Sequence, residues 1–188
     1  MPKLIIGLVG QAGCGKGTAT DLLKNEYRAG YIRFSGLLEQ IVNILGVERS
    51  RENLIKVSTG LRAELGEDIL SYAVEKYALN ADEDIIVVDG IRRIDDIAAL
   101  EPLPQFKLLA IDAPADLRFE RMKKRGEKAT EANMTWEQFE KEGAAPTERD
   151  IPKVMERAWR TLDNSGSKEE FEALVRESLG DLGFKPLS

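Results

Sequence analysis

Short apolar runs that end at glycine or acidic residues recur along the chain. LIIGLV, residues 4–9, is apolar at both odd and even positions and stops at a glycine cluster, as a strand buried on both faces does. DIIVVDG (84–90) and FKLLAID (106–112) repeat this pattern. Two shorter segments, YIRF (31–34) and RTLDN (160–164), complete five predicted strands.

Amphipathic segments separate these strands, with apolar residues three and four positions apart, and predict helices. Ser35 is a fair N-cap for the run that Gly46 closes, and a break near Gly66 divides residues 51–79 into two helices. Further helices are expected over about 15–28, after Pro114, up to about 159, and over 168–182. Strands alternating with helices predict one three-layer α/β domain over residues 1–188, with a parallel five-stranded sheet covered on both faces.

Composition narrows the classes of function. With 188 residues, 43% hydrophobic and 32% charged, the chain has the balance of a soluble globular protein. A net charge of −6 gives no general attraction to nucleic acid polymers or anionic membranes, and no apolar run is long enough to cross a bilayer, so a cytoplasmic protein is expected. One cysteine and no histidine exclude an internal disulfide, a Cys/His zinc cluster and a histidine-based triad.

The stretch GQAGCGKGT, residues 10–18, follows the first strand and precedes the first helix. Glycines in this context let backbone N–H groups curl around phosphates, while a lysine supplies a mobile charge. The residues expected to bind ATP here are Gly10, Gly13, Cys14, Gly15, Lys16, Gly17 and Thr18. The alternative is a tight turn with a chance lysine. Cys14 is either a reactive thiolate or, as we favour, a small residue that fills the loop.

DGIRR, residues 89–93, follows the second strong strand. An Asp at the end of a strand beside a phosphate loop is suited to Mg²⁺, so Asp89 and Thr18 are the predicted metal ligands. Arg92 and Arg93 suggest a clamp for a second phosphate group. In the alternative, Asp89 caps the next helix and both arginines are solvated.

DLRFERMKKRGEK, residues 116–128, places several cations at helical spacing before a polar, weakly periodic excursion over about 125–150. Phosphoryl transfer must exclude water, so this excursion is a candidate lid and Arg121 and Arg125 are its best catalytic pair. The alternative is a solvated basic face paired with Glu120 and Glu127.

The position of Gly17 directly after Lys16, with the hydroxyl one residue later, resembles the loop of adenylate kinase and its nucleoside monophosphate kinase relatives. DGIRR is similar to their DG-x-x-R stretch, in which the arginine holds the acceptor phosphate. TLDNSGSKEEF, residues 161–171, resembles a segment of dephospho-coenzyme A kinases and nucleotide kinases that passes the purine, which implies that Asn164 lies near ATP. The resemblance implies a P-loop NTPase fold and covers most of the chain.

The residues that follow the predicted strand YIRF (31–34) indicate the kind of acceptor. Dephospho-coenzyme A kinases and nucleoside kinases tend to carry an acid there, whereas this chain reads FSGLL, which favours an acceptor that is already anionic. The acceptor-binding helices are then expected over about 35–79. Ser35 is a contact to the acceptor or only a helix cap, and Arg62 is a phosphate ligand or a surface residue paired with Glu64 or Glu67.

Together these patterns predict an ATP- and Mg²⁺-dependent kinase of nucleoside or deoxynucleoside monophosphates, either monomeric or homodimeric, with small-molecule partners. Lys16, Asp89, Arg121 and Arg125 are its predicted catalytic residues, and Ser35, Arg62, Arg92 and Arg93 bind the acceptor. Two alternatives stay open: a dephospho-coenzyme A kinase, and a P-loop ATPase or switch that acts with a protein partner. The chain contains neither an NKxD motif, expected of a GTPase, nor an LSGGQ motif, expected of an ABC-type ATPase.

Overall fold

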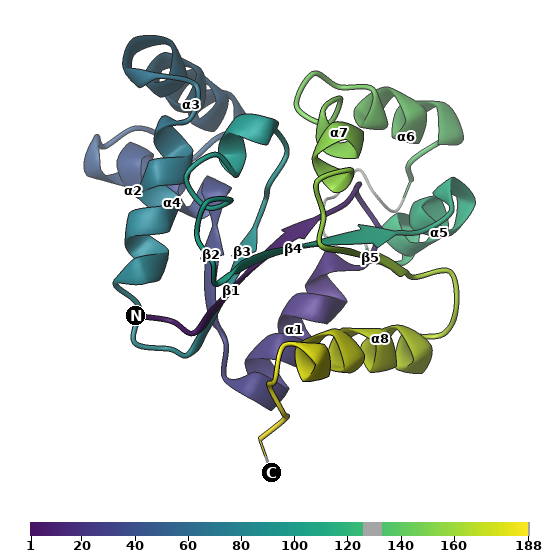
Figure 1. Ribbon diagram of the computed structural model, residues 1–188. Helices are drawn as coiled ribbons and strands as arrows, with labels where there is room; N and C mark the ends of the chain where they lie inside the picture. Colours follow the sequence, from purple (N-terminus) through teal and green to yellow (C-terminus); the bar gives the residue numbers. More distant parts are fainter. Residues whose placement is uncertain (126–132, 188) are drawn as a thin grey trace.

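A parallel sheet forms the centre of the molecule (Figure 1). The computed structural model describes residues 1–125 and 133–187. Within these residues the strand order is β2-β3-β1-β4-β5, and every neighbouring pair is parallel. The strands are β1 (Leu4–Val9), β2 (Gly30–Arg33), β3 (Ile85–Asp89), β4 (Phe106–Asp112) and β5 (Arg160–Asp163). The predicted five-stranded α/β fold is confirmed.

Helices cover both faces of the sheet, as the strands buried on both sides require. Alternate residues of β1 show the division. Ile5 and Val9 pack in a core with α2 (Phe34–Ile44), α4 (Ile69–Leu79) and α7 (Ile151–Met155). Leu4, Ile6 and Leu8 pack in the opposite core with α1 (Lys16–Tyr27) and α8 (Lys168–Asp181), which lie side by side in Figure 1.

Several predicted helix boundaries are correct and two are wrong. α3 (Arg51–Leu65) and α4 are separated at Gly66 as expected, and α5 (Ala115–Arg125) begins directly after Pro114. α2 instead starts at Phe34 with Arg33 at the N-cap, so Ser35 is not a cap. α7 ends at Met155, before the predicted 159, because the Trp159 N–H already bonds to the Leu108 carbonyl at the start of β5 pairing.

The predicted excursion over about 125–150 contains a helix, α6 (Trp136–Gly143). A capping box begins it, in which the Thr135 hydroxyl accepts from the Gln138 N–H and the Gln138 side chain accepts from the Thr135 N–H. Phe139 packs with Phe119, Met122 and Met134 in a small core of its own. Residues 126–132 of the proposed lid, including Glu127, lie outside the described residues.

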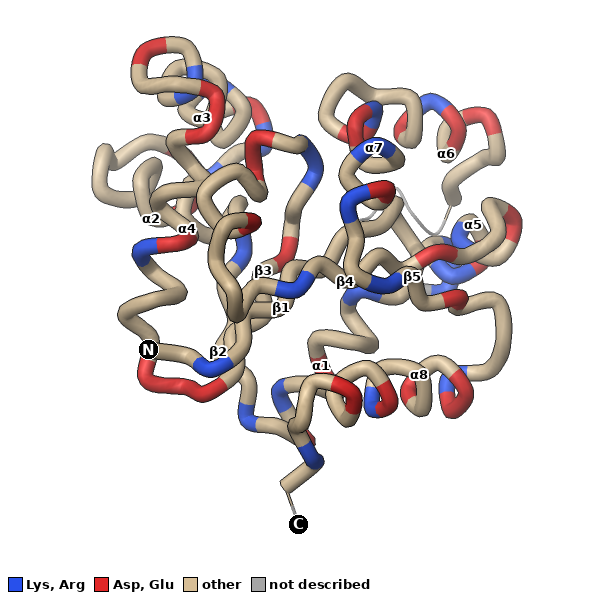
Figure 2. The backbone as a smooth tube through the Cα atoms, in the orientation of Figure 1, with Lys and Arg blue, Asp and Glu red and all other residues tan. Residues whose placement is uncertain are grey.

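Charge is mixed over the surface rather than separated by sign. Figure 2 shows acidic and basic positions interspersed along α6 and α8. Among the described residues, none of the helices combines the length and the apolar character that crossing a bilayer demands.

Candidate active site

The loop between β1 and α1 has a backbone that requires glycine. Gly13 and Gly15 have φ angles of 79° and 114°, which side chains rarely adopt. A Cβ on Gly13 would lie 2.5 Å from the Arg118 carbonyl oxygen, and one on Gly15 would overlap the Asn164 amide. The loop is therefore closely packed on its outer side, against α5 and the end of β5.

Two side chains hold the carbonyls of this loop. Asn164, which is buried, donates from Nδ2 to the Cys14 carbonyl at 2.7 Å, and Arg118 donates to the Ala12 and Ala113 carbonyls at 3.3 and 3.1 Å. Burial lowers the pKa of Arg118. With these carbonyls engaged from outside, the first N–H groups of α1, which have no partner within the helix, are available at its positive end.

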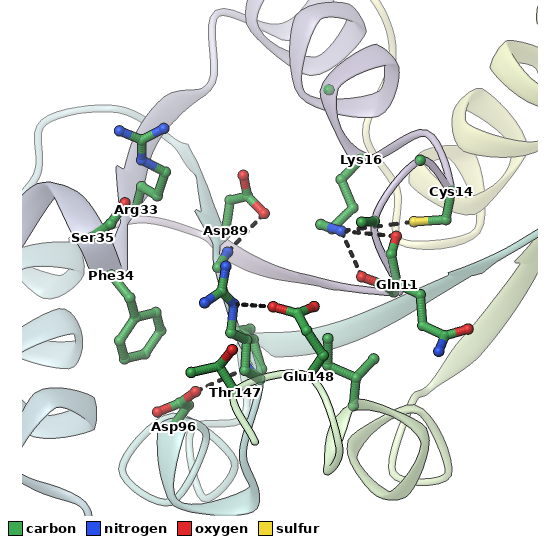
Figure 3. A pocket seen from close by; sticks show the side chains of 18 of the residues that line it. Gln11, Cys14, Lys16, Arg33, Phe34, Ser35, Asp89, Asp96, Thr147 and Glu148 are labelled. Carbon is green, nitrogen blue, oxygen red and sulfur yellow. Dashed lines mark hydrogen bonds and ion pairs between the residues drawn. The ribbon is translucent and has the colours of Figure 1, made fainter. Parts of the chain in front are cut away.

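Lys16 lies over the loop rather than pointing to solvent (Figure 3). Its Nζ donates to the Gly10 carbonyl at 2.5 Å and to the Gln11 carbonyl at 3.4 Å, and lies 3.8 Å from the Cys14 Sγ. A flexible ammonium held by neutral groups, two backbone carbonyls and a thiol, is ready to exchange them for phosphate oxygens. Cys14 itself is 1% exposed, which supports its interpretation as a packing residue.

Asp89 ends β3 and is fixed by two donors. Its Oδ1 accepts from the Gly90 N–H at 2.7 Å and its Oδ2 accepts from the Tyr31 hydroxyl at 3.0 Å. Burial raises the pKa of Tyr31 to about 12, helped by the charge of Asp89 and by this hydrogen bond. Asp89 does not cap the next helix, since η1 (Ile94–Asp96) starts later, with Arg93 at its N-cap.

The residues near Asp89 fit a magnesium ion bound together with a nucleotide. Thr18 and Asp89 line the same cavity and offer a hydroxyl and a carboxylate. The described residues contain no group of three or more His, Cys, Asp or Glu side chains able to hold a metal. The Thr18 hydroxyl and the Asp89 carboxylate are donors suited to Mg²⁺, because this ion keeps several waters and takes phosphate oxygens as its other ligands.

Three arginines lie where an acceptor is expected, and each is paired with a glutamate. The pairs are Arg33–Glu39 at 3.1 Å, Arg92–Glu148 at 3.4 Å and Arg93–Glu67 at 3.2 Å. The arginine side chains are 40–49% exposed, so the pairs are open to solvent and weak. A phosphate that binds all three guanidinium groups would displace these carboxylates.

Ser35 and Arg62 line the same cavity but differ in environment. Ser35 is a half-buried residue in the first turn of α2. Arg62 is 8% exposed and not a surface residue, and its guanidinium pairs with the buried carboxylate of Asp96 at 2.6 Å. It also donates to the backbone carbonyl of Glu67.

The predicted lid pair is only partly described. Arg121 donates to the Asn164 backbone carbonyl at 2.9 Å and to its side-chain oxygen at 3.4 Å, so it meets the predicted ATP residue Asn164 at the edge of the loop. Arg125 is the last residue of α5, and its side chain lies outside the described part.

A cavity of about 1260 Å³ extends from the phosphate loop to Arg33, Arg92 and Arg93. In Figure 3, Asp89 lies between Lys16 on one side and Arg33 with Ser35 on the other. The cavity also contains residues that sequence reasoning missed: Tyr31, Arg33, Asp96, Thr147 and Glu148. Of these, Arg33 had a signal, because it directly precedes the position searched for an acid after the second strand.

Comparisons with known proteins bear on the family and the fold of the chain. A family model described as an AAA domain matches residues 9–140. A UPF0200 protein of Thermococcus kodakarensis is 31% identical over 186 residues, covering 95% of this chain and 98% of its own. Two solved structures share the fold, each with a TM-score of 0.62. TT1252 from Thermus thermophilus is 18% identical and covers 97% of this chain and 99% of its own.

The second structure is a shikimate kinase from Bacteroides thetaiotaomicron, 12% identical, covering 96% of this chain and 99% of its own. At these identities the two structures show the fold alone, which is that of a P-loop kinase. The family model and the relative, which extends over nearly the whole chain, show more. The chain belongs to the UPF0200 family and carries an AAA domain with a P-loop, kinase-like fold.

Proposed function

We propose that this protein transfers the terminal phosphoryl group of ATP to a nucleoside or deoxynucleoside monophosphate. The observation that carries the proposal is the continuous cavity with a phosphate loop at one end and three solvent-open arginines at the other. Its volume of about 1260 Å³ exceeds the roughly 300–1000 Å³ of an ordinary single-ligand pocket, so it has room for two nucleotides.

The donor end binds ATP through the loop from Gly10 to Thr18. The α1 N-terminus and Lys16 neutralise the outer phosphates, while Arg118 and Asn164 keep the loop in shape from behind. Thr18 and Asp89 would hold Mg²⁺, which supplies charge neutralisation and orientation of the phosphates. Arg121, which contacts Asn164 at the edge of the loop, and Arg125 are proposed to neutralise charge on the transferring group.

The acceptor end is suited to an anion. Arg33, Arg92 and Arg93 would exchange their glutamate partners for the oxygens of the acceptor monophosphate, with Ser35 beside them. A monophosphate oxygen is already a nucleophile, so alignment and charge neutralisation are the main requirements. The cations that line both ends of the cavity support this proposal.

A hydroxyl acceptor, as in a dephospho-coenzyme A kinase, is the second candidate. It is favoured by the carboxylates of Asp89 and Glu148 in the cavity, either of which would serve as a base within reach of an O–H group. Both carboxylates already accept hydrogen bonds or pair with an arginine, which makes them less available for this role.

The test is ADP formation from ATP and Mg²⁺ with each ribo- and deoxyribonucleoside monophosphate and with dephospho-coenzyme A. We expect one or a few monophosphates to raise ADP formation far above the rate without acceptor. Stimulation by dephospho-coenzyme A alone would favour the second candidate, and ATP consumption that no small acceptor changes would contradict both.

A further inference from the structure

One ion pair at the acceptor end is almost fully buried and has no role in the chemistry described above. Arg62 and Asp96 are 8% and 3% exposed. Burying two charges is unfavourable unless their remaining donors and acceptors are satisfied. Both oxygens of Asp96 and both terminal nitrogens of Arg62 have hydrogen-bond partners, and these partners show which segments the pair holds together.

The two oxygens of Asp96 have different partners. Oδ1 accepts from Arg62 Nη2 at 2.6 Å, which joins α3 to η1. Oδ2 accepts from the backbone N–H groups of Arg92 and Arg93, at 2.8 and 3.0 Å. One carboxylate therefore fixes the main chain of both arginines of DGIRR.

Arg62 ties the same segment to the end of α3. Its Nη1 donates to the Glu67 carbonyl, and the Glu67 carboxylate pairs with the Arg93 guanidinium. The guanidinium of Arg62 is thus occupied by protein groups on two sides.

We propose that Arg62 and Asp96 form a positioning pair that sets the affinity for the acceptor phosphate by fixing the backbone of Arg92 and Arg93, and that Arg62 does not itself bind the acceptor. This rests on the proposed function, since it concerns the acceptor end of that site. The side chains of Arg92 and Arg93 are 49% and 40% exposed, so the direction in which each projects depends mainly on its backbone.

Asp96→Asn tests the pair, and Glu101→Gln is its matched control. Glu101 pairs bidentately with Arg157 on the surface, so this control also turns a paired carboxylate into an amide, outside the cavity. We expect the KM for the acceptor monophosphate to rise about tenfold or more in Asp96→Asn, because small misplacements of binding groups are costly. The KM for ATP and kcat should change less than about twofold, and Glu101→Gln should change nothing.

Amide hydrogen exchange supplies a readout independent of turnover. In the wild-type protein the N–H groups of Arg92 and Arg93 should be protected although both side chains are open to solvent, and in Asp96→Asn they should exchange about tenfold faster. If Asp96→Asn does not fold, Arg62→Lys serves instead. It keeps the charge but loses the fork, so it should raise the acceptor KM by a smaller factor.

The possible results distinguish failure of the positioning role from failure of the proposed function. Equal changes in the KM values for ATP and acceptor, or wild-type amides of Arg92 and Arg93 that exchange as fast as an unstructured loop, would overturn the positioning role. If the wild-type protein phosphorylates a monophosphate but neither Asp96→Asn nor Arg62→Lys alters its KM, this inference alone fails. If no monophosphate is phosphorylated at all, the proposed function fails, and the inference about acceptor affinity with it.

Discussion

At the scale of single residues, the site depends on a few positions where the backbone conformation or the hydrogen-bond partners restrict which residue fits. Gly15 needs its positive φ and the space that the Asn164 amide fills, whereas Gly17 has open space around it and an ordinary helical backbone. Asp89 is held by one backbone and one side-chain donor. These constraints give predictions that do not depend on the identity of the acceptor.

Gly15→Ala and Gly17→Ala are a matched pair of substitutions two residues apart. Gly15→Ala should lower the free energy of unfolding by about 1–3 kcal/mol, because it adds backbone strain and overlap with Asn164. Gly17→Ala, in the first turn of α1, should be neutral or stabilise by up to about 1 kcal/mol. Chemical denaturation measures both, and equal effects would contradict the described loop geometry.

Tyr31 should make the free energy of unfolding fall as the pH becomes alkaline. Its pKa is about 12 in the folded protein, above the ordinary value of 10.0, so folding favours the protonated phenol. Its contribution to stability is therefore fully present below pH 10 and is lost as the pH rises from 10 to about 12. Melting temperatures measured from pH 9 upward should fall more steeply for the wild-type protein than for Tyr31→Phe. Parallel curves would show that Tyr31 has no such role.

At the scale of elements, α6 is fastened to the phosphate loop through one side chain. Phe119, Trp136 and Phe139 form an aromatic cluster with ring centroids 5.3–5.6 Å apart. The Arg118 guanidinium lies 5.3 Å from the centroid of Phe139 and also holds the Ala12 carbonyl of the loop. Contacts through Arg118 thus run from α6 to the place where ATP is proposed to bind.

Phe139→Ala should loosen α6 without unfolding the sheet. The cluster is separate from the two cores that flank the sheet, so we expect the opening free energy of α6 to fall by about 3 kcal/mol. Hydrogen exchange should accelerate in Trp136–Gly143 and stay unchanged in β1 and β3. Trp159→Ala, which removes an exposed aromatic side chain stacked on Arg160, is the control. Unaltered exchange in α6 would contradict this packing.

The sequence predicted the elements where local pattern and tertiary context agree. β1, β3 and β4 are continuous apolar runs that end at turn residues, so burial on both faces could be inferred directly. α6 was missed because only Phe139 among its eight residues is buried, in a core formed with α5, which no local period reveals. Ser35 was wrongly predicted to be the N-cap because serine is a common capping residue. The N-cap is instead Arg33, which has the extended backbone of that position although its side chain does not cap the helix.

The site could be predicted in part for the same reason. The loop and Asp89 follow strands whose ends meet at one edge of the sheet, which is a rule of topology. The partner of Arg62 could not be predicted, because Asp96 is 34 residues away along the chain and meets Arg62 only in the folded structure. Glu148 likewise pairs with Arg92, which is distant in sequence, so no local pattern indicates their contact.

At the scale of the whole molecule, the account requires that one cavity hold a donor and an acceptor together. Transfer of the terminal phosphate of ATP between them is therefore the central claim. The most direct measurement uses ATP labelled in its terminal phosphate, Mg²⁺ and the monophosphate that best stimulates ADP formation, with the wild-type protein and Lys16→Ala.

We predict that label appears in the nucleoside diphosphate formed from the acceptor, in a one-to-one ratio with ADP. Lys16→Ala should retain the fold and lose this transfer, by about a hundredfold or more, because the charge that neutralises the outer phosphates is gone. Label found only in inorganic phosphate, at a rate that the acceptor does not change, or near-normal transfer by Lys16→Ala, would contradict the account.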